Sequence, residues 1–423
     1  MFCQKPGILI LFLLFAAAGL AATPVAQETD SWGERIERLR AVPYVDLVAD
    51  TVGNDLSGVV MLDRDRAQPG YNLYCTRFTG QAFLMDLTGR IVHQWDYLSA
   101  EESGSYHHAV MLDNGDLLAI KQHSKLLRLD WDSRIIWQKR YAVHHDLAPA
   151  PDGTLYAIVR DHQIYRRMRV WFDAIVHLIP GGEELRRWST FDHLDELKAV
   201  LDPRSFLDTV LDSALAGRPE SGREASDIKA AVAKGRYDFD YFHMNTISLL
   251  PATALGRQDA RFREGNLLVC LRNVNQIVIL EKGSYRVLWA WGEGRLQWPH
   301  HPSMLSNGHI LVFDNGVRRE YSRILELDPR SGEIVWSYQA DQPEDFYSPA
   351  RGSAQRLANG NTLICESDQG RAFEITPAGE MVWLWLNPGR QGARRQTVYR
   401  MTRRPPDVVD PLLRRRWWYL ENY

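Results

Sequence analysis

One short unit recurs six times along the chain, and this repeat limits the fold more than any other feature. Each copy has a turn with a glycine, followed by an apolar strand that ends five residues later. The six copies run from Gly70 to Cys75, Gly115 to Ile120, Gly153 to Ile158, Gly265 to Cys270, Gly308 to Phe313 and Gly360 to Cys365. Units of about 40 residues built from short strands and turns are typical of β-propeller blades.

A tryptophan marks the end of each copy. Six of the 14 tryptophans stand at the end of an expected fourth strand: Trp95, Trp137, Trp188, Trp289, Trp336 and Trp383. A large aromatic side chain at this position most simply fills the space between neighbouring sheets. Both series give six blades, and a ring of sheets leaves only short, protected edges. We therefore predict an all-β fold, a six-bladed β-propeller of four-stranded blades.

The repeat also sets the expected domain boundaries. The propeller should span 56–388, with the run VVML at 59–62 as the first strand of its first blade. The repeat stops between 191 and 239, where the apolar spacing favours two or three helices inserted between the third and fourth blades. Inserted elements usually cover one mouth of such a ring. The Arg-rich tail 389–423 is expected to be a strap packed back on the ring with solvated arginines, rather than a binding element.

The N-terminal region has a different composition. Residues 1–22 carry one lysine and then an apolar run from 7 to 22, which is typical of a secretory signal. This run has 16 residues, short of the ~20 that span a bilayer, so an uncleaved membrane anchor at 7–22 is the less favoured alternative. Residues 23–55 should form a linker with a short amphipathic helix at 30–42. We expect the protein to be periplasmic or secreted.

Charge and cysteine usage exclude some partners and cross-links. Lys+Arg 50 against Asp+Glu 53 gives a net charge of -3, so nothing indicates nucleic acid as a partner. Cys75, Cys270 and Cys365 occupy the same strand position in three blades. Equivalent strands of adjacent blades lie about 10 Å apart, whereas bridged Cα atoms need roughly 4.4–6.8 Å. We predict three buried thiols and no disulfide.

Histidines recur at the start of the innermost strands. The first strand of each blade lines the central channel, so residues at one end of these strands converge on the axis. The histidines at this place in the second to fifth blades are His108, His145, His243 and His301. Ser353 stands there in the sixth blade. A hydrophobic core requires no such coincidence, so we predict a functional site at one mouth of the channel.

The spacing of these histidines leaves two chemistries open. Imidazole binds zinc, copper and iron, and it also acts as a nucleophile and as an acid or base near neutral pH. The neighbouring Asn245 and Arg272 supply amide and guanidinium donors, which suit an anion and repel a metal cation. The alternative for Arg272 is a surface ion pair. We therefore expect an anion site with no metal and no cofactor.

Four segments resemble the bacterial arylsulfotransferase family, enzymes that move a sulfuryl group without a nucleotide donor. These segments are FHMN (242–245), LLVCLRNVNQIVIL (267–280), WPHHPSML (298–305) and VFDNGVRREYSRILELD (312–328). The resemblance covers 56–388 and is strongest over 241–328. It implies a six-bladed propeller and a ping-pong transfer from an aryl sulfate to a phenol, both small molecules.

The resemblance also implies roles for individual residues. His301 would attack the sulfur and become transiently sulfurylated, and His243 with Asn245 would form the His-X-Asn pair of the family. The arginine of the family falls on Arg272. A further catalytic histidine falls on His145 or, less favoured, His144. Through proximity to these, His108, His144 and His300 are expected to contact the substrate.

The chain differs from the family in two features, and two other functions are also compatible with the sequence. The chain has no cysteine pair of the kind that some exported relatives have, and the insertion at 191–239 has no assigned counterpart. A non-catalytic propeller that serves as a binding or assembly scaffold of the cell envelope is the alternative function, and a quinone or metal oxidoreductase is a third. A common cavity shared by His145, His243, Arg272 and His301 would favour the enzyme.

Overall fold

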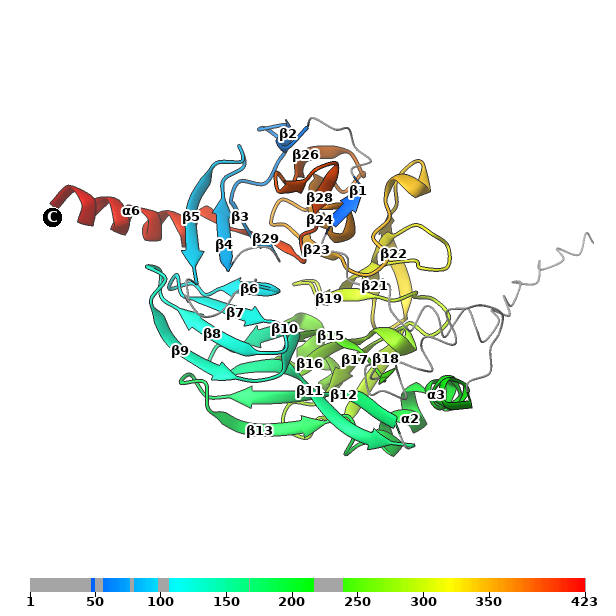
Figure 1. The fold of residues 1–423 in the computed structure, drawn as a ribbon. Helices are drawn as coiled ribbons and strands as arrows, with labels where there is room; N and C mark the ends of the chain where they lie inside the picture. Colours follow the sequence, from blue (N-terminus) through cyan, green and yellow to red (C-terminus); the bar gives the residue numbers. More distant parts are fainter. Residues whose placement is uncertain are drawn as a thin grey trace, which may run out of the picture.

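The computed structural model describes residues 47–49, 56–76, 80–97, 106–166, 168–216 and 239–422. These residues form a ring of six antiparallel β-sheets around a central channel, which confirms the predicted propeller (Figure 1). The expected signal segment at 1–22 and the expected helix at 30–42 lie outside the described residues. Within the described ranges, no helix combines the length and the apolar character needed to cross a membrane.

Each blade runs from an inner strand beside the channel to an outer strand at the rim. Blade 1 contains β29 (Met401–Arg404), β3 (Tyr71–Cys75), β4 (Gln81–Met85) and β5 (Ile91–Asp96). Blade 2 contains β6 (His108–Met111), β7 (Leu117–Lys121), β8 (Lys125–Leu129) and β9 (Ile135–Arg140). Blade 3 contains β10 (Val143–Pro149), β11 (Leu155–Tyr165), β12 (Met168–Leu178) and β13 (Glu184–Ser189), with β14 (Phe239–Asp240) added beside β12.

The other three blades follow the same order. Blade 4 contains β15 (Met244–Leu249), β16 (Leu267–Leu271), β17 (Gln276–Leu280) and β18 (Val287–Trp291). Blade 5 contains β19 (His300–Met304), β20 (Ile310–Asp314), β21 (Arg323–Asp328) and β22 (Glu333–Tyr338). Blade 6 contains β23 (Ser353–Arg356), β24 (Thr362–Glu366), β25 (Arg371–Ile375), β26 (Met381–Leu386) and, outermost, β2 (Gly58–Leu62). A small separate sheet contains β1 (Leu47–Ala49), β28 (Arg394–Gln396) and β27 (Arg390–Gln391).

The ring closes with strands from both ends of the chain, and here the sequence-based prediction was wrong. The run VVML lies in β2, which pairs with β26 at the outer edge of blade 6 and not at the inner edge of blade 1. The inner strand of blade 1 is β29, in which Met401 pairs with Tyr74. The propeller therefore extends beyond residue 388. An apolar run specifies a strand but not its neighbour, so the pattern of VVML could not reveal this exchange.

The six repeat tryptophans join each blade to the next, as predicted. Four of them donate a hydrogen bond from Nε1 to a carbonyl oxygen in the turn between the third and fourth strands of the following blade. The pairs are Trp137 to Pro180 at 2.9 Å, Trp289 to Pro329 at 3.0 Å, Trp336 to Pro377 at 2.9 Å and Trp383 to Leu87 at 2.9 Å. The other two pack on aromatic rings in the equivalent turns, Trp95 on Trp131 and Trp188 on Tyr285. The motif is thus a repeated contact between blades.

The insertion contains two described helices, α2 (Leu194–Leu201) and α3 (Phe206–Ala216). The Asp208 carboxylate fastens them to the long hairpin of blade 3 and to the start of blade 4, because it accepts hydrogen bonds from the hydroxyls of Tyr165 and Tyr241 at 3.1 and 2.8 Å. The helical part of the prediction is confirmed. Both helices lie at the rim of the ring beside blades 3 and 4, and not over its centre (Figure 1).

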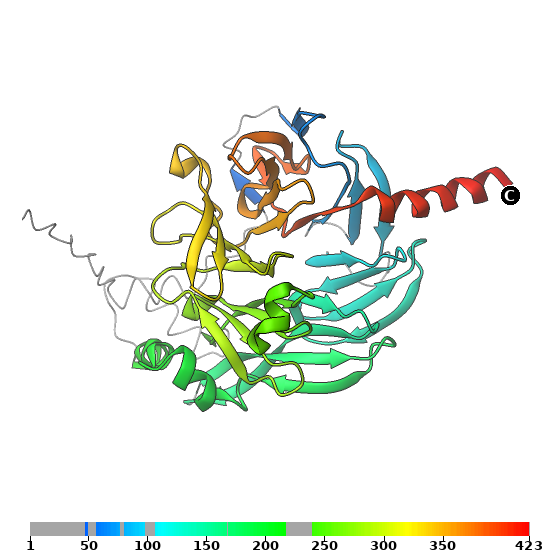
Figure 2. The same ribbon diagram turned by 180° about the vertical axis from the view of Figure 1, so that it is seen from behind.

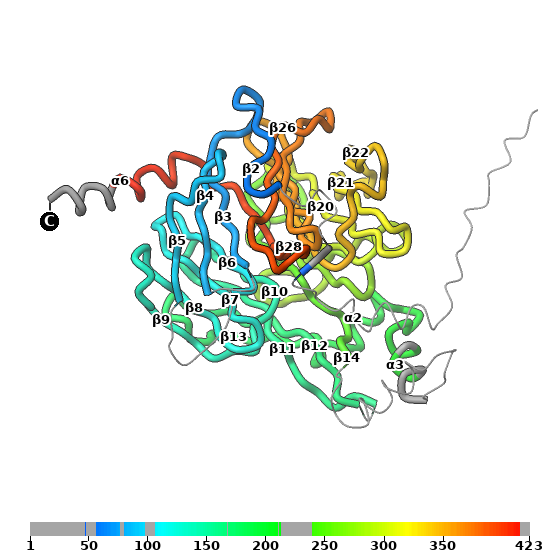
Figure 3. The backbone as a smooth tube through the Cα atoms, turned by 45° about the horizontal axis from the view of Figure 1, so that its top comes forward, coloured from blue at the N-terminus to red at the C-terminus, as the bar shows by residue number. Residues whose placement is uncertain are grey.

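The tail packs back on the ring, as predicted, but its arginines are not all solvated. Arg395 is 0% exposed and Arg403 is 4% exposed. Arg403 lies in β29 and donates from Nε to the side-chain oxygen of Asn72 at 2.6 Å. The chain then ends in α6 (Pro406–Asn422), a helix that the sequence analysis did not predict and that extends away from the ring (Figures 2 and 3). The position of β29 in the ring is what buries the charge of Arg403.

The remaining elements are short. They are α5 (Ala254–Gln258) and the 3-10 turns η1 (Ala260–Phe262), η2 (Arg272–Val274), η3 (Pro343–Asp345) and η4 (Ser367–Gln369). Cys75, Cys270 and Cys365 are buried and free, as predicted.

Candidate active site in the central channel

Three of the four repeat histidines share an unusual backbone conformation. His145, His243 and His301 have φ angles of 57°, 55° and 48°, in the left-handed region that non-glycine residues seldom occupy. His145 and His301 lie where the pairing register of the inner strand shifts, between Val143 and Leu147 in blade 3 and between His300 and Ser303 in blade 5. His243 immediately precedes β15, whose register shifts between Met244 and Thr246. Such bulges re-aim side chains and cluster at functional sites. The sequence repeat therefore corresponds to a repeated geometry that directs imidazoles toward the channel.

His145 is the centre of a buried cluster of imidazoles. Its ring centroid lies 4.7 Å from that of His243, 4.8 Å from that of His144 and 5.5 Å from that of His107. The Nδ1 atoms of His144 and His145 are 2.5 Å apart, so one of them carries the shared hydrogen. All four residues are at most 3% exposed. The structure thus brings together three of the candidate site residues, His144, His145 and His243, and it adds His107.

Two aspartates support this cluster, the buried Asp173 and the partly exposed Asp240. The Nδ1 of His243 lies 2.6 Å from Oδ2 of Asp240, and the Nε2 of His144 lies 3.3 Å from Oδ1 of Asp173. Burial and the neighbouring Asp240 raise the pKa of Asp173. Burial opposes ionisation of Asp240 too, but His243, Arg160 and Arg272 hold its pKa below the ordinary value. The sequence analysis missed both aspartates. Asp240 is three residues before His243, whereas no motif marks Asp173.

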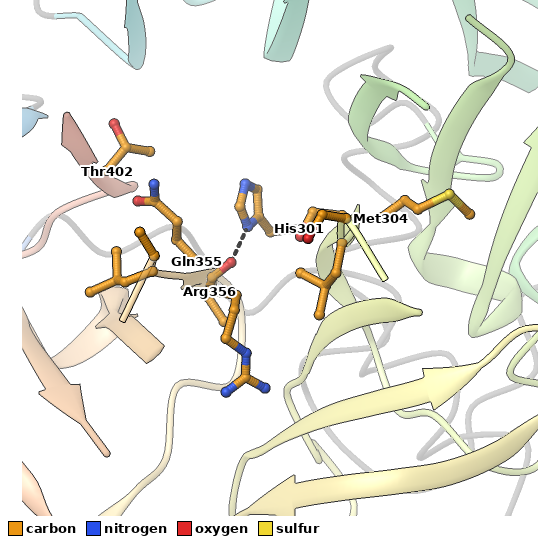
Figure 4. Close-up of a pocket in the computed structure, with 11 residues that line it drawn as sticks. His301, Met304, Gln355, Arg356 and Thr402 are labelled. Atoms are coloured by element: carbon orange, nitrogen blue, oxygen red, sulfur yellow. Dashed lines mark hydrogen bonds between the residues drawn. The ribbon is translucent and has the colours of Figure 1, made fainter. Parts of the chain in front are cut away.

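His301 has a defined tautomer and an accessible ring nitrogen. Its Nδ1 lies 3.1 Å from the carbonyl oxygen of Ala354, and since a carbonyl only accepts, Nδ1 carries the hydrogen. Nε2 therefore has a free lone pair, and His301 lines a cavity (Figure 4). Burial and the positive charge of Arg400 lower the pKa of His301 to about 3. The imidazole is neutral at neutral pH.

A buried ion pair lies beside His301, and the sequence analysis missed it. The Arg400 guanidinium donates to both carboxylate oxygens of Asp146, at 3.0 and 3.2 Å. The Nε2 of His108 is 3.3 Å from the same guanidinium and 3.3 Å from the same carboxylate. The side chain of Arg400 is only 9% exposed, so the expectation of solvated tail arginines was wrong for this residue as well. Asp146 is visible in the HHD motif, but Arg400 gave no signal because it reaches the site only through ring closure.

His300 repeats the tautomer of His301. Its Nδ1 lies 2.8 Å from the side-chain oxygen of Asn315, whose amide nitrogen donates to the carbonyls of Ser348 and Arg351. The amide is therefore oriented with its oxygen toward His300, and the hydrogen is on Nδ1. Within the described part of the chain, the buried Nε2 of His300 has no hydrogen-bond partner. Burial lowers the pKa of His300 to about 3, so this ring is also neutral.

Arg272 and Asn245 are buried and already engaged. Arg272 is 5% exposed, its guanidinium carbon lies 4.4 Å from the centroid of the Trp298 ring, and its charge lowers the pKa of His243 after the larger effect of burial. This burial excludes the alternative of a surface ion pair. Asn245 is 0% exposed and donates from Nδ2 to the carbonyl oxygen of Pro299 at 2.9 Å. Asn245 therefore holds the backbone that leads into His301.

A cavity of about 520 Å³ lies in the channel between blades 5, 6 and 1. It is lined by His301, Ser303, Met304, Leu305, Ser306, Ala354, Gln355, Arg356, Leu357, Ala358 and Thr402. Figure 4 shows His301 on one side of it, with Gln355 and Thr402 on the other. His301 lines this cavity, but His145, His243 and Arg272 do not. The expected common cavity is thus not seen, and His301 lies between this cavity and the remaining buried groups.

The histidines, cysteines and carboxylates of the described residues are not arranged as metal ligands. Within the described ranges, no three histidine, cysteine or carboxylate side chains are grouped so as to hold a metal ion. The donor set around His301 is instead an arginine, an ionised carboxylate and neutral imidazoles. This arrangement suits proton transfer and the binding of a single negative group.

Comparison with known proteins gives one family and several structures of similar fold. A family model described as Arylsulfotransferase (ASST) matches residues 108–387, more than half of the 423-residue chain. No curated protein matches the chain.

Two solved structures illustrate the similarity of fold. A protein of unknown function from Bacteroides caccae is 15% identical over 79% of this chain and 99% of that chain, with a TM-score of 0.47. A catalytically inactive virginiamycin B lyase from Staphylococcus aureus is 10% identical over 80% of this chain and 87% of that chain, with a TM-score of 0.42. At these identities the likeness concerns the fold alone.

Proposed function

This chain belongs to the arylsulfotransferase (ASST) family, and on that premise we propose that it transfers a sulfuryl group from an aryl sulfate to a phenol through a sulfohistidine at His301. The observation that carries the proposal is the hydrogen bond from Nδ1 of His301 to the Ala354 carbonyl. It leaves Nε2 unprotonated at the end of a cavity of ligand size. Family membership supports arylsulfotransferase activity in general, and the steps below are our proposal.

In the first half of the proposed reaction, the lone pair on Nε2 of His301 attacks the sulfur of an aryl sulfate. The N–S bond forms as the bond from sulfur to the aryl oxygen breaks, and the electron pair of that bond leaves on the oxygen. A neighbouring histidine that has first taken up a proton from solvent gives this proton to the oxygen, and the phenol departs while that imidazole returns to its neutral form. In the second half an acceptor phenol loses its proton to the same histidine and attacks the sulfur, which frees His301.

We assign the proton transfer to His108 in preference to His145 and His243. His108 is the repeat histidine whose charge acts on the pKa of His301, behind the larger effects of burial, Arg400 and Asp146. Its Nε2 is also 3.3 Å from the Asp146 carboxylate, which orients the ring. In this proposal His145 and His243 belong to the buried support of the site. The sequence analysis had expected the reverse assignment.

Arg400 is the cation that we place beside the sulfuryl oxygens. Sulfuryl transfer spreads negative charge over the non-bridging oxygens, and fixed donors that meet this charge stabilise the transition state. The bidentate bond to Asp146 fixes the plane of the guanidinium, and an arginine has five N–H groups, so donors remain for a ligand. Arg272 affects His243 and His300 instead, and its proposed role is to keep those rings neutral.

The lack of unpaired positive charge on the cavity wall supports a sulfuryl donor that contains no nucleotide. Arg356 is the one cationic side chain among the lining residues, and it is paired with the Glu326 carboxylate at 2.6 Å. Its guanidinium points away from His301 (Figure 4). A nucleotide donor would bring several negative charges that this wall does not compensate. An aryl sulfate brings one, which Arg400 can meet.

One observation favours the alternative of a non-catalytic scaffold. His144, His145 and His243 are buried and hydrogen-bonded to one another or to an aspartate, which is how structural histidines behave. Under that alternative the histidine repeat would stabilise the channel and His301 would have no substrate. Activity therefore has to be measured directly.

The test is an initial-rate assay with nitrophenyl sulfate as donor, a phenol as acceptor and no nucleotide. We expect turnover by the wild-type protein, double-reciprocal plots that are parallel at different acceptor concentrations, and loss of turnover in His301→Ala. His162→Ala changes an exposed histidine of β11 and serves as the matched control. Absence of turnover in the wild-type protein over a range of donors and acceptors would favour the scaffold.

A further inference from the structure

The cavity extends from His301 in the direction away from the other histidines. It follows β19 and β23 to the turns that connect the first and second strands of blades 5 and 6. His301 is half-buried, whereas Ser306 and Ala358 in those turns are exposed. The cavity therefore opens at the mouth formed by these turns, which we call the turn mouth. His145 and His243 lie toward the opposite end of the channel, outside the cavity, and are 1% and 3% exposed.

The walls of the cavity offer hydroxyl groups. Ser303 and Thr402 both line it and are partly exposed, and neither hydroxyl bonds another group in the described part of the chain. The amide of Gln355 is occupied, since it donates to the backbone oxygen of Arg403 at 3.1 Å and accepts from its backbone nitrogen at 2.7 Å. The hydroxyls of Ser303 and Thr402 are thus available to bond a ligand in the cavity, whereas the Gln355 amide is not.

The walls offer no uncompensated charge. Arg356 bonds Glu326 and also donates to the backbone oxygen of Gly360 at 3.0 Å. At the inner end, Arg400 is paired with Asp146, and its remaining donors are those that we assign to the sulfate. A ligand that lies along the cavity beyond its sulfate would therefore meet polar but uncharged groups, and an additional ionic group would be desolvated without compensation.

The size of the cavity indicates more than one ring. Pockets of about 300–1,000 Å³ hold drug-sized molecules, and the 520 Å³ found here lies well inside that range. A single-ring phenol held at His301 would leave the part beyond Ser303 and Thr402 unfilled. Those two hydroxyls would then have no ligand group to bond.

We propose that the cavity binds an uncharged aromatic compound of two or more rings with a second hydroxyl group, which enters through the turn mouth. One phenolic oxygen, free or sulfated, lies at Nε2 of His301, and the second hydroxyl bonds Ser303 or Thr402. The placement of the reacting oxygen rests on the function proposed above. The access route and the preference for a second hydroxyl rest on the cavity itself.

Calorimetric titration of the full-length protein, without any sulfate donor, tests this inference. The probes are a dihydroxynaphthalene, naphthol and a naphthalenedisulfonate. We expect the diol to bind about tenfold more tightly than naphthol, which is the effect of one good hydrogen bond, and the disulfonate not to bind. Equal affinity for the diol and naphthol, or preferred binding of the disulfonate, would overturn the proposal.

Variants locate the ligand within the cavity. Thr402→Val with Ser303→Ala should abolish the tenfold preference for the diol, whereas Thr88→Val, in an exposed turn of blade 1, should preserve it. Ala358→Trp should weaken binding of both probes at least tenfold by blocking the turn mouth. Pro151→Trp puts the same bulk in the equivalent turn of blade 3 and should change affinity little. Equal losses in the two tryptophan variants would contradict the access route.

Two controls distinguish a loss of folding, and a failure of the proposed enzyme function, from a failure of the cavity proposal. Thermal melting of each variant is compared with that of the wild-type protein, and Ser306→Trp in blade 5 replaces Ala358→Trp if the latter does not fold. Binding requires no turnover. Diol binding by a protein without sulfotransfer activity would therefore support the cavity while rejecting the enzyme. Activity toward single-ring phenols with no preference for diols would reject the cavity proposal alone.

Discussion

The Thr246 hydroxyl accepts a hydrogen bond from the backbone N–H of His301 at 3.0 Å, so blade 4 holds blade 5 at the residue that we propose as nucleophile. The same hydroxyl donates to the side-chain oxygen of Asn245 at 3.1 Å. Asn245 in turn bonds the backbone at Pro299. Blade 4 thus fixes both sides of the bulge in which His301 has its left-handed conformation.

We predict that Thr246→Val lowers kcat for sulfuryl transfer about tenfold with little change in KM, because a small displacement of the reacting atom is costly. Thr246→Ser keeps the hydroxyl and should restore most of the rate. Steady-state kinetics of both variants, with Thr88→Val as control, provide the measurement. A serine variant as slow as the valine variant would show that the hydroxyl is not what positions His301.

We predict two separable effects of Arg400→Gln. The variant leaves the buried Asp146 carboxylate without its partner, so the free energy of unfolding should fall by about 3–5 kcal/mol. It also removes the proposed transition-state cation, so kcat/KM should fall by about 10²–10³. These effects are measured by urea unfolding and by initial rates, with Arg394→Gln at an exposed tail position as control.

The double variant Arg400→Gln with Asp146→Asn separates structure from catalysis. It replaces the ion pair by two neutral amides, so most of the stability should return while the activity stays low. Recovery of both would mean that Arg400 acts only by keeping the protein folded.

We predict that stability falls as the pH is lowered from the ordinary histidine pKa of about 6.5 toward 4. Burial, the largest cause in each case, depresses the folded-state pKa of His144, His300 and His301 to about 3 and that of His243 to about 4. Within this window the unfolded chain binds protons that the folded protein does not. Each histidine then lowers the free energy of unfolding by about 1.4 kcal/mol per pH unit.

Denaturant titrations at several pH values from about 8 to about 4 measure this effect. Above the unfolded pKa these groups are neutral in both states, so they give no slope there. His162→Ala should leave the curve unchanged because that side chain is exposed. The rate of the first half-reaction should not fall with an apparent pKa near 6.5, since His301 stays neutral. A slope that vanishes between pH 6.5 and 4 would contradict the burial of neutral histidines.

We predict that Trp383→Phe destabilises the protein more than Trp336→Phe does. Both variants lose a hydrogen bond to a turn of the next blade, which contributes about 1 kcal/mol. Trp383 is 0% exposed and lies at ring closure between blades 6 and 1, so the orphaned carbonyl and the lost packing add to its cost. Trp336 is partly exposed, so in its variant a water molecule can donate the hydrogen bond that the indole N–H no longer makes. Equal losses of unfolding free energy in the two variants would argue against this difference.

The sequence predicted the fold because its signals are local and repeated. Turn glycines and strand-end tryptophans recur in every blade, and except at ring closure each tryptophan contacts the next blade along the chain. The pairing of VVML was mispredicted because either of two sheets accepts an apolar strand. The choice was decided by β29, which lies more than 300 residues away along the chain and carries no repeat signature.

The site residues that the repeat marks could be predicted from the sequence, and those supplied by distant segments could not. The histidines at 145, 243 and 301 were found because blade symmetry places them at one position, and the structure gives them one backbone conformation. Arg400 and Asp173 were missed because each reaches the site through contacts between distant segments. Arg400 arrives with the closing strand, and Asp173 faces His144 from the third strand of blade 3.

The proposed sulfohistidine is tested most directly by the intact mass of the protein after brief incubation with nitrophenyl sulfate and no acceptor. The wild-type protein should gain one sulfuryl group and release one equivalent of nitrophenol. The modification should map to the peptide that contains His301, and addition of a phenol should remove it. His301→Ala should gain nothing, whereas His162→Ala should behave as wild type. A gain that persists in His301→Ala, or nitrophenol release without any gain in mass, would contradict a sulfohistidine at His301.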